Sequence, residues 1–264
     1  MKRVVSGIVF VPLFVALLFF GSPGAFFIFT LVTILIAIWE YFNIISRIGI
    51  EGYPYLGLVL SFLLTLCFYL DARFLLEWVF VSLLGTFSVW AWRDGDIRTA
   101  LDQIVYTIFG VLWVGGTLGY LVLLRNLEDG DLLLSFLFLT VWSGDTAAYY
   151  GGKTYGRRSL APAVSPKKTF EGAIFGLVGS VTMGLLAHFW FIPSILIAHC
   201  LIMGLFCGII GQLGDLAESV LKRHAGVSDS GNLIPGHGGV LDRMDGIMFA
   251  GPALYFYYKW VVVG

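Results

Sequence analysis

The chain has 264 residues, of which 58% are hydrophobic and 12% are charged, with a formal net charge of −1 at pH 7. A typical soluble domain is about 25% charged, and no soluble domain of this size buries so much apolar surface in one core. The composition therefore excludes a soluble globular enzyme, a disordered chain and a disulfide scaffold, and it predicts a polytopic membrane protein.

The predicted elements are transmembrane helices, each of which needs about 20 mostly apolar residues. Nine stretches qualify, at 4–20, 25–46, 52–70, 74–92, 104–124, 132–151, 171–192, 194–223 and 241–263. The first resembles a signal peptide but lacks a convincing cleavage site, so we expect it to be retained as a span. The predicted fold class is all-α, a polytopic integral membrane protein of about nine helices.

The Lys and Arg residues predict the orientation. With the N-terminus in the cytoplasm, thirteen of the sixteen fall inside, and the three outside are Arg73, Arg125 and Lys259. Under the positive-inside rule, this split favours an N-in, C-out protein of the cytoplasmic membrane.

Candidate functional polar residues are unevenly distributed along the chain. Residues 1–131, expected to form about five helices, hold few ionisable candidates beyond Glu40 and Glu77 and are predicted to be a scaffold. Residues 132–264 are predicted to form the catalytic region, with about four helices and two cytoplasmic loops, 152–170 and 224–240.

Five acids fall in or beside the later spans, where an ionisable group is costly and marks function: Asp145, Asp215, Glu218, Asp242 and Asp245. The spacing i, i+3 puts each of the last two pairs on one helix face. Oxygen ligands from three helices would suit a hard cation, above all Mg²⁺. Alternatively, Asp242 and Asp245 only complement a helix dipole, and Glu218 forms an ordinary salt bridge with Lys222 or Arg223.

Cations accompany these acids: Lys167, Lys168, Lys222, Arg223 and Arg243. Cations mixed with metal-binding carboxylates are what a polyphosphate substrate needs. The glycine-rich loop 231–239 lies between the two acid pairs and leads into a helix N-terminus, which is an anion site in many proteins. Within it, His237 could donate to a phosphate, act as an acid or cap the turn.

These residues form a recognisable pattern. It comprises Ser219-x-x-Lys222-Arg223, Asp229, Gly231, Pro235, His237-Gly238-Gly239 and Asp242-Arg243-x-Asp245, preceded by Asp145-x-x-Ala148-Tyr149 and Ser165-Pro166-x-Lys168-Thr169-x-Glu171-Gly172. The pattern resembles the phosphatidate cytidylyltransferases (CDP-diacylglycerol synthases). One position departs from the family pattern: Ser228 stands where the family usually has lysine.

The resemblance implies that CTP and phosphatidic acid give CDP-diacylglycerol and pyrophosphate, without a protein nucleophile. It implies Mg²⁺, with room for a second, monovalent cation such as K⁺, and a homodimer in the lipid bilayer with no nucleic-acid partner. The expected metal ligands are Asp145, Asp215, Glu218, Asp242 and Asp245. The catalytic set combines Asp215, Asp242 and Asp245 with Lys222 and Arg223. The expected substrate-binding residues are Lys167, Lys168, Ser219, His237, Gly238, Gly239 and Arg243.

Two other functions stay open. A CTP-dependent polyprenol or phytol kinase would share the membrane setting and the nucleotide, but it would transfer the γ-phosphoryl group to an alcohol. A transporter could also use acids in broken membrane helices, although it should carry polar groups near the middle of the membrane. The CDP-alcohol phosphotransferase motif begins like Asp242-x-x-Asp245-Gly246, but Ile247 and the residues after it do not continue that motif.

Overall fold

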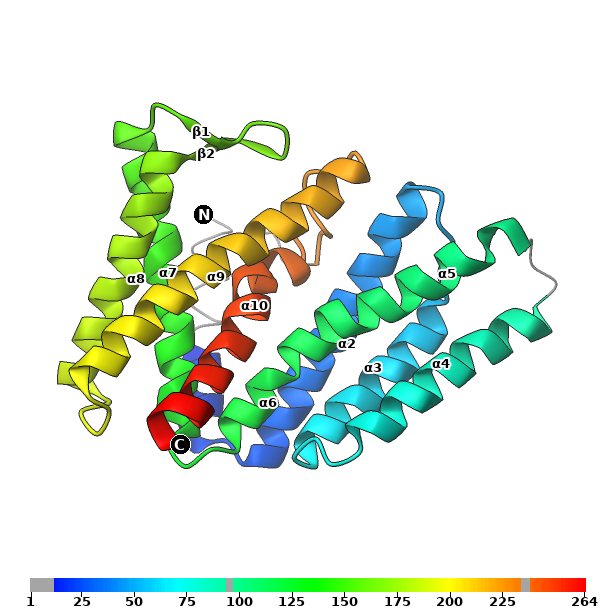
Figure 1. Cartoon of the computed structure of the whole chain (residues 1–264), viewed down its shortest axis with the longest axis horizontal. Coiled ribbons are helices and arrows are strands. Elements are labelled where there is room, and N and C mark those ends of the chain that lie inside the picture. The colour runs from blue at the N-terminus through cyan, green and yellow to red at the C-terminus, as the bar shows by residue number, and fades with distance from the viewer. Residues whose placement is uncertain (1–11, 94–96, 234–237) are drawn as a thin grey trace. The chain divides into compact units, whose positions relative to one another are not determined.

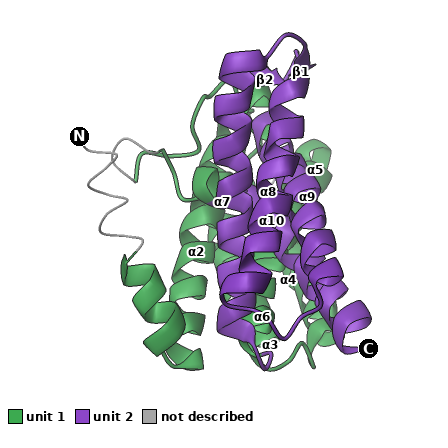
Figure 2. Ribbon diagram, turned by 90° about the vertical axis from the view of Figure 1, so that its left-hand side faces the viewer, with its two compact units in different colours: residues 1–126, 221–243 green, residues 127–220, 244–264 purple. Residues whose placement is uncertain are grey.

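The computed structural model describes residues 12–93, 97–233 and 238–264. It divides into two compact units (Figure 2). Unit 1 comprises Met1–Asn126 and Leu221–Arg243, and unit 2 comprises Leu127–Val220 and Met244–Gly264. The functional division predicted at residues 131 and 132 stays a prediction.

Unit 1 is built from helices (Figure 1). After a helical segment at residues 12–20 come α2 (Pro23–Arg47), α3 (Pro54–Tyr69), α4 (Leu75–Trp92), α5 (Ile97–Gly110), the π-helix η1 (Val111–Gly116) and α6 (Tyr120–Arg125). Local sequence explains where α2 begins: Ser22 accepts a hydrogen bond from the Ala25 N–H at 3.1 Å. Proline follows at the first helical position, where its missing N–H costs nothing.

The core of unit 1 surrounds α2. The Tyr41 side chain is completely buried, and its hydroxyl donates to the Tyr106 carbonyl at 2.9 Å. Gly110 lies against the Tyr41 ring, so any side chain there would overlap the ring. Trp78 donates its indole N–H to the Leu60 carbonyl at 3.0 Å. The contacts of Tyr41 pack α2 against α5, and α2 carries Glu40 beside Tyr41.

Unit 2 contains the later helices. Its elements are α7 (Gly130–Tyr155), β1 (Ser159–Ala161), β2 (Ser165–Thr169), α8 (Phe170–Trp190), most of α9 (Ile197–His224), most of α10 (Leu241–Tyr257) and the π-helix η2 (Tyr258–Val263). Small residues let helices α7, α8 and α9 pack closely, as is common in membrane bundles. Ser180 of α8 donates to the Thr140 carbonyl of α7 at 3.1 Å, while Gly204 of α9 lies against the Ser180 carbonyl.

The expectation of an all-α fold is wrong in one place. Within the predicted loop 152–170, α7 continues to Tyr155, and β1 and β2 then form an antiparallel pair in which Ser159 faces Thr169. The strands are three and five residues long, which is too short for an alternating pattern to stand out in the sequence. Thr169 then caps α8, because its side chain accepts the Gly172 N–H at 3.1 Å.

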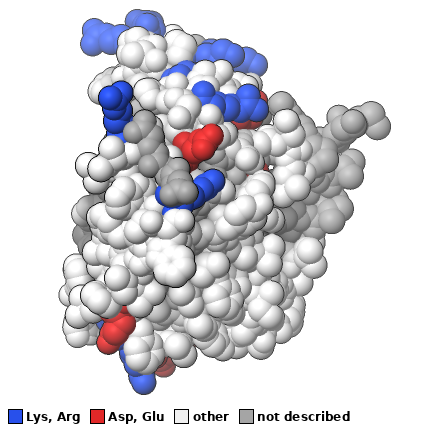
Figure 3. Space-filling view, turned by 90° about the vertical axis from the view of Figure 1, so that its right-hand side faces the viewer, with Lys and Arg blue, Asp and Glu red and all other residues white. Residues whose placement is uncertain are grey.

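The prediction of a polytopic membrane protein is confirmed. Six helical segments in the described part of the chain are long and apolar enough to cross a membrane, and the shorter α3 is also apolar. Large apolar side chains lie on the surface, including Leu76 and Trp92 of α4, which are 84% and 91% exposed. Figure 3 shows a broad region without Lys, Arg, Asp or Glu between charged side chains near the top and the bottom of the view. A surface of this kind suits lipid rather than water.

Candidate active site

Acidic side chains from three helices of unit 2 gather around Asp245. Asp145 on α7 and both Asp215 and Glu218 on α9 lie close enough to Asp245 on α10 to interact with it electrostatically. Glu218 is completely buried, Asp215 and Asp245 are partly exposed, and Asp145 is exposed. The structure thus brings four of the five predicted acids into one region of unit 2, and their role as metal ligands stays a prediction.

Close packing of α9 on α10 positions two of these acids. A Cβ atom on Gly214 would fall on the Asp245 carbonyl oxygen, and a Cβ on Gly211 would lie 3.6 Å from the Gly246 carbonyl oxygen. Glycines at these two positions let the backbones approach closely. Asp215 is adjacent to this crossing, so it is placed next to the helix that carries Asp245.

The hairpin adds a cation to this group. Lys168, on β2, places its Nζ 2.5 Å from Asp215 Oδ2. Both side chains are about one-third exposed, at 29% and 34%. Lys167, the preceding residue of β2, is exposed. Since successive strand residues point to opposite faces, Lys168 faces the acids and Lys167 faces away from them.

The residues around Asp245 fit a hard divalent cation by their chemistry. All four acids offer oxygen ligands, which Mg²⁺ prefers, and Mg²⁺ is usually bound by one or two carboxylates together with substrate phosphates. Within the described residues, no three His, Cys, Asp or Glu side chains are placed to hold a metal ion by themselves.

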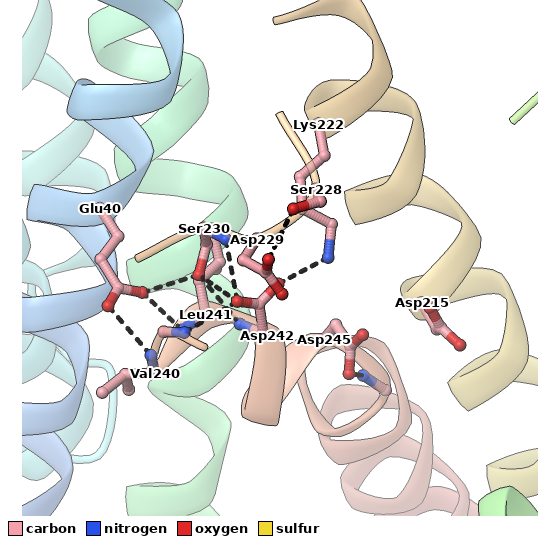
Figure 4. Close-up of polar contacts among 12 residues, drawn as sticks. Glu40, Asp215, Lys222, Ser228, Asp229, Ser230, Val240, Leu241, Asp242 and Asp245 are labelled. Atoms are coloured by element: carbon pink, nitrogen blue, oxygen red, sulfur yellow. Dashed lines mark hydrogen bonds and ion pairs between the residues drawn. The ribbon is translucent and has the colours of Figure 1, made fainter. Parts of the chain in front are cut away.

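A second cluster lies in unit 1, around Asp242 at the start of α10 (Figure 4). Asp242 Oδ2 accepts hydrogen bonds from the Ser230 N–H at 2.8 Å, the Ser230 hydroxyl at 2.9 Å and the Gly239 N–H at 2.8 Å. Its Oδ1 accepts from Lys222 Nζ at 2.6 Å. The Lys222 and Asp242 side chains are only 13% and 6% exposed. Asp242 thus binds both ends of the glycine-rich loop and a cation of α9.

These contacts bear on the predicted roles of the loop glycines. Gly239 gives its N–H to Asp242, so this group already has an acceptor within the protein. Gly238 has a φ of +82°, in the left-handed region that glycine tolerates. The contacts of Asp242 also agree with the alternative in which this acid complements the helix N-terminus. Direct substrate binding by these residues stays a prediction.

Glu40 of α2 is a member of this cluster that sequence reasoning left out of the site. Only 5% of its surface is exposed. It accepts hydrogen bonds from the Val240 N–H at 3.0 Å, the Leu241 N–H at 2.9 Å and the Ser230 hydroxyl at 3.0 Å (Figure 4). Its one sequence signal is that it is a carboxylate within an apolar span.

The other predicted site residues differ in solvent exposure. Ser219 is buried, whereas Arg223 and Arg243 are exposed. His237 lies outside the described residues. Ser228, which replaces the lysine expected from the resemblance, donates to the Asp229 carboxylate at 2.6 Å.

Comparison with known proteins finds a matching family model and similar curated proteins. A family model described as "Cytidylyltransferase family" matches residues 1–261. The chain is 32% identical over 286 aligned positions to a phosphatidate cytidylyltransferase of Synechocystis sp., covering 97% of this chain and 95% of that protein.

Other curated relatives match over shorter stretches. The phosphatidate cytidylyltransferase of Bacillus subtilis is 39% identical over 156 residues, which is 59% of this chain and 58% of that protein. The one from Brucella melitensis is 44% identical over 156 residues, which is 56% of this chain and 55% of that protein. The alignment thus spans little more than half the length of these two relatives.

Proposed function

Because the chain belongs to the cytidylyltransferase family, we propose that it is a phosphatidate cytidylyltransferase, which makes CDP-diacylglycerol from CTP and phosphatidic acid. The observation that carries this proposal is the group of carboxylates around Asp245, with Lys168 bound to Asp215. Carboxylates and a cation are what a metal-bound triphosphate requires. The six candidate membrane spans among the described residues also suit a lipid substrate.

The proposed reaction needs no nucleophile from the protein. A phosphate oxygen of phosphatidic acid, already anionic at pH 7, forms a bond to the α-phosphorus of CTP. The bond between the α-phosphorus and the bridging oxygen breaks, and pyrophosphate leaves with the electron pair. The protein's task is to align these groups and neutralise their charge.

In this proposal the acids bind the metal and the cations bind the phosphates. Asp215 and Asp245 would hold Mg²⁺, with Asp145 and Glu218 beside them, and Asp242 is included among the metal ligands by resemblance to the family. When bound, the metal supplies positive charge to the phosphate oxygens. A monovalent cation such as K⁺ could accompany it. The residues proposed to bind phosphates are Lys167, Lys168, Lys222, Arg223 and Arg243, with Ser219 and His237 shaping the nucleotide site.

The membrane setting determines how the lipid would arrive. The distribution of Lys and Arg supports an N-in, C-out topology with the site on the cytoplasmic face. The phosphate of the lipid would then enter sideways from the inner leaflet of the cytoplasmic membrane. A homodimer is part of this proposal by resemblance to the family.

Purified full-length protein in detergent tests the function directly. We expect pyrophosphate release from CTP and Mg²⁺ only when phosphatidic acid is present, together with a lipid product that contains the cytidylyl group. Asp245→Asn should abolish turnover while the protein remains folded. CDP release with a phosphorylated alcohol would instead indicate a kinase, and absence of both reactions would refute the proposed function.

A further inference from the structure

Glu40 joins the scaffold of unit 1 to the loop that holds Asp242. Its two carboxylate oxygens accept the Val240 and Leu241 N–H groups, which lie at the entrance of α10. Free N–H groups at a helix start need an acceptor when they are buried. Since α2 is held by the buried Tyr41, Glu40 is a fixed point against which the start of α10 is placed.

The Ser230 hydroxyl connects Glu40 with Asp242. Its Oγ lies 3.0 Å from Glu40 Oε2 and 2.9 Å from Asp242 Oδ2, and it also accepts the Asp242 N–H at 3.3 Å. The hydroxyl has one hydrogen, which it donates to one carboxylate at a time, so Ser230 contacts both carboxylates of residues that are about 200 positions apart in the chain and belong to different helices. A shift of Glu40 would be passed on to Asp242 through this contact.

Two glycines leave the space that the Glu40 carboxylate occupies. A Cβ on Gly231 would lie 2.5 Å from Glu40 Oε1, and a Cβ on Gly239 would overlap Glu40 Oε2 and the Ser230 hydroxyl. The loop therefore fits around this carboxylate closely at both of its ends. Gly239 in turn donates its N–H to Asp242, so the same short segment contacts both acids.

We propose that Glu40 is a positioning residue for nucleotide binding, which acts through Ser230 and the start of α10 to fix Asp242 and its partner Lys222. The inference rests on the proposed cytidylyl transfer, in which Lys222 binds phosphates of CTP. Asp242 fixes the Lys222 ammonium at 2.6 Å. Displacing Asp242 would move this cation, so the effect should fall on CTP rather than on the lipid.

Steady-state kinetics of Glu40→Gln tests this role. The substitution keeps the shape but replaces one acceptor oxygen with an NH₂ group that faces N–H and O–H donors. We expect kcat/KM for CTP to fall about 10- to 100-fold, the usual effect of removing an outer partner of a site residue. We expect KM for CTP to rise and KM for phosphatidic acid to stay at its wild-type value.

Whether Glu40→Gln changes KM for CTP or only the apparent kcat distinguishes a positioning role from a purely structural one. If Glu40 only stabilised the fold, Glu40→Gln would reduce the amount of active enzyme and hence the apparent kcat, leaving both KM values unchanged. That result would overturn the proposal. The matched control is Glu51→Gln, the same chemical change at an exposed position of unit 1, which should behave like the wild type.

Ser230→Ala tests the connection and serves if Glu40→Gln does not fold. It removes the bridging hydroxyl but leaves the bonds from Val240 and Leu241 to Glu40. We expect KM for CTP to rise, and an unchanged value would contradict transmission through Ser230. Residues that act along one path are not additive, so the double variant should be no worse than the more severe single variant. If the effects of Glu40→Gln and Ser230→Ala on kcat/KM for CTP multiplied in the double variant, the two residues would not act along one path.

Two measurements keep the inference independent of turnover. In Glu40→Gln, the amides of Val240 and Leu241 should exchange with deuterium faster than in the wild type, and the dissociation constant for CTP with Mg²⁺ should rise. Neither should change in Glu51→Gln. If the wild type made no CDP-diacylglycerol, the proposed function would fail, while these two measurements would still decide the role of Glu40. Unchanged exchange and CTP binding would overturn it.

Discussion

Lys222 Nζ lies 2.6 Å from Asp242 Oδ1, so a cation near the end of α9 is bound to an acid in the first turn of α10. Both side chains are nearly buried, at 13% and 6% exposure. A pair this well enclosed costs more to break than a surface pair, because the remaining charge loses its partner without gaining water.

Lys222→Met should therefore destabilise the protein as well as weaken CTP binding. The substitution keeps most of the apolar stem and leaves Asp242 without its cation. We expect a loss of about 1–3 kcal/mol in stability, less than for a fully buried pair because some solvent reaches both groups. Thermal unfolding in detergent measures this. Lys259→Met, at an exposed position near the C-terminus, is the control, and equal unfolding temperatures for the two variants would contradict the prediction.

Gly214 should be intolerant of any side chain. A Cβ at this position would overlap the Asp245 carbonyl oxygen, so alanine must push α9 away from α10 and separate Asp215 from Asp245. A displacement of about 1 Å in a catalytic group can cost roughly 100-fold in rate, and we expect Gly214→Ala to lose at least about 10-fold in kcat/KM. Gly85→Ala is a matched control, because a Cβ there meets nothing within 4 Å. Wild-type activity in Gly214→Ala would show that the crossing does not position the acids.

The helices and the acids on α9 and α10 could be predicted because their signals are local. Long apolar runs indicate membrane helices, and the predicted stretch 25–46 corresponds to α2 at Pro23–Arg47. The spacing of Asp215 and Glu218 follows from helix geometry. Packing of small residues on α7, α8 and α9 then brings these acids near Asp145 and Asp245.

The role of Glu40 could not be predicted in this way. Its partners Ser230, Val240 and Leu241 are 190 to 201 residues further along the chain, and no periodicity connects such distant positions. The sequence shows only that a carboxylate occurs in an apolar span, which marks function without identifying it. The same limit applies to Asp242: its spacing suggested a metal ligand, whereas its contacts with Ser230 and Gly239 depend on how the loop folds back.

The two lysines of β2 should differ in importance. Lys168 contacts Asp215 at 2.5 Å, whereas Lys167 is exposed on the other face of the strand. We expect Lys168→Met to lower kcat/KM for CTP by about 10- to 100-fold, because it removes a group that orients a proposed metal ligand. Lys167→Met should cost less, since a lone exposed cation contributes little binding energy. Initial rates of pyrophosphate release compare them, and a larger loss at Lys167 would refute the assignment of the two faces.

The acids around Asp245 indicate that activity depends on a divalent metal. Substituting one of them should raise the Mg²⁺ concentration that the enzyme needs. Chelation of Mg²⁺ should stop turnover, and adding Mg²⁺ back should restore it. Asp215→Asn removes one anionic ligand but leaves the rest of the group, so any remaining activity should need about 10- to 100-fold more Mg²⁺ for half-saturation. The measurement is a Mg²⁺ titration of pyrophosphate release at fixed concentrations of CTP and phosphatidic acid.

The control for this titration is Asp102→Asn, the same chemical change at an exposed position of α5. It should keep the wild-type Mg²⁺ requirement, because a carboxylate on the surface of unit 1 takes no part in the group around Asp245. If Asp215→Asn lost activity with an unchanged requirement for Mg²⁺, Asp215 would be holding Lys168 rather than the metal. The contact between Lys168 and Asp215 would then be the reason why this acid is needed.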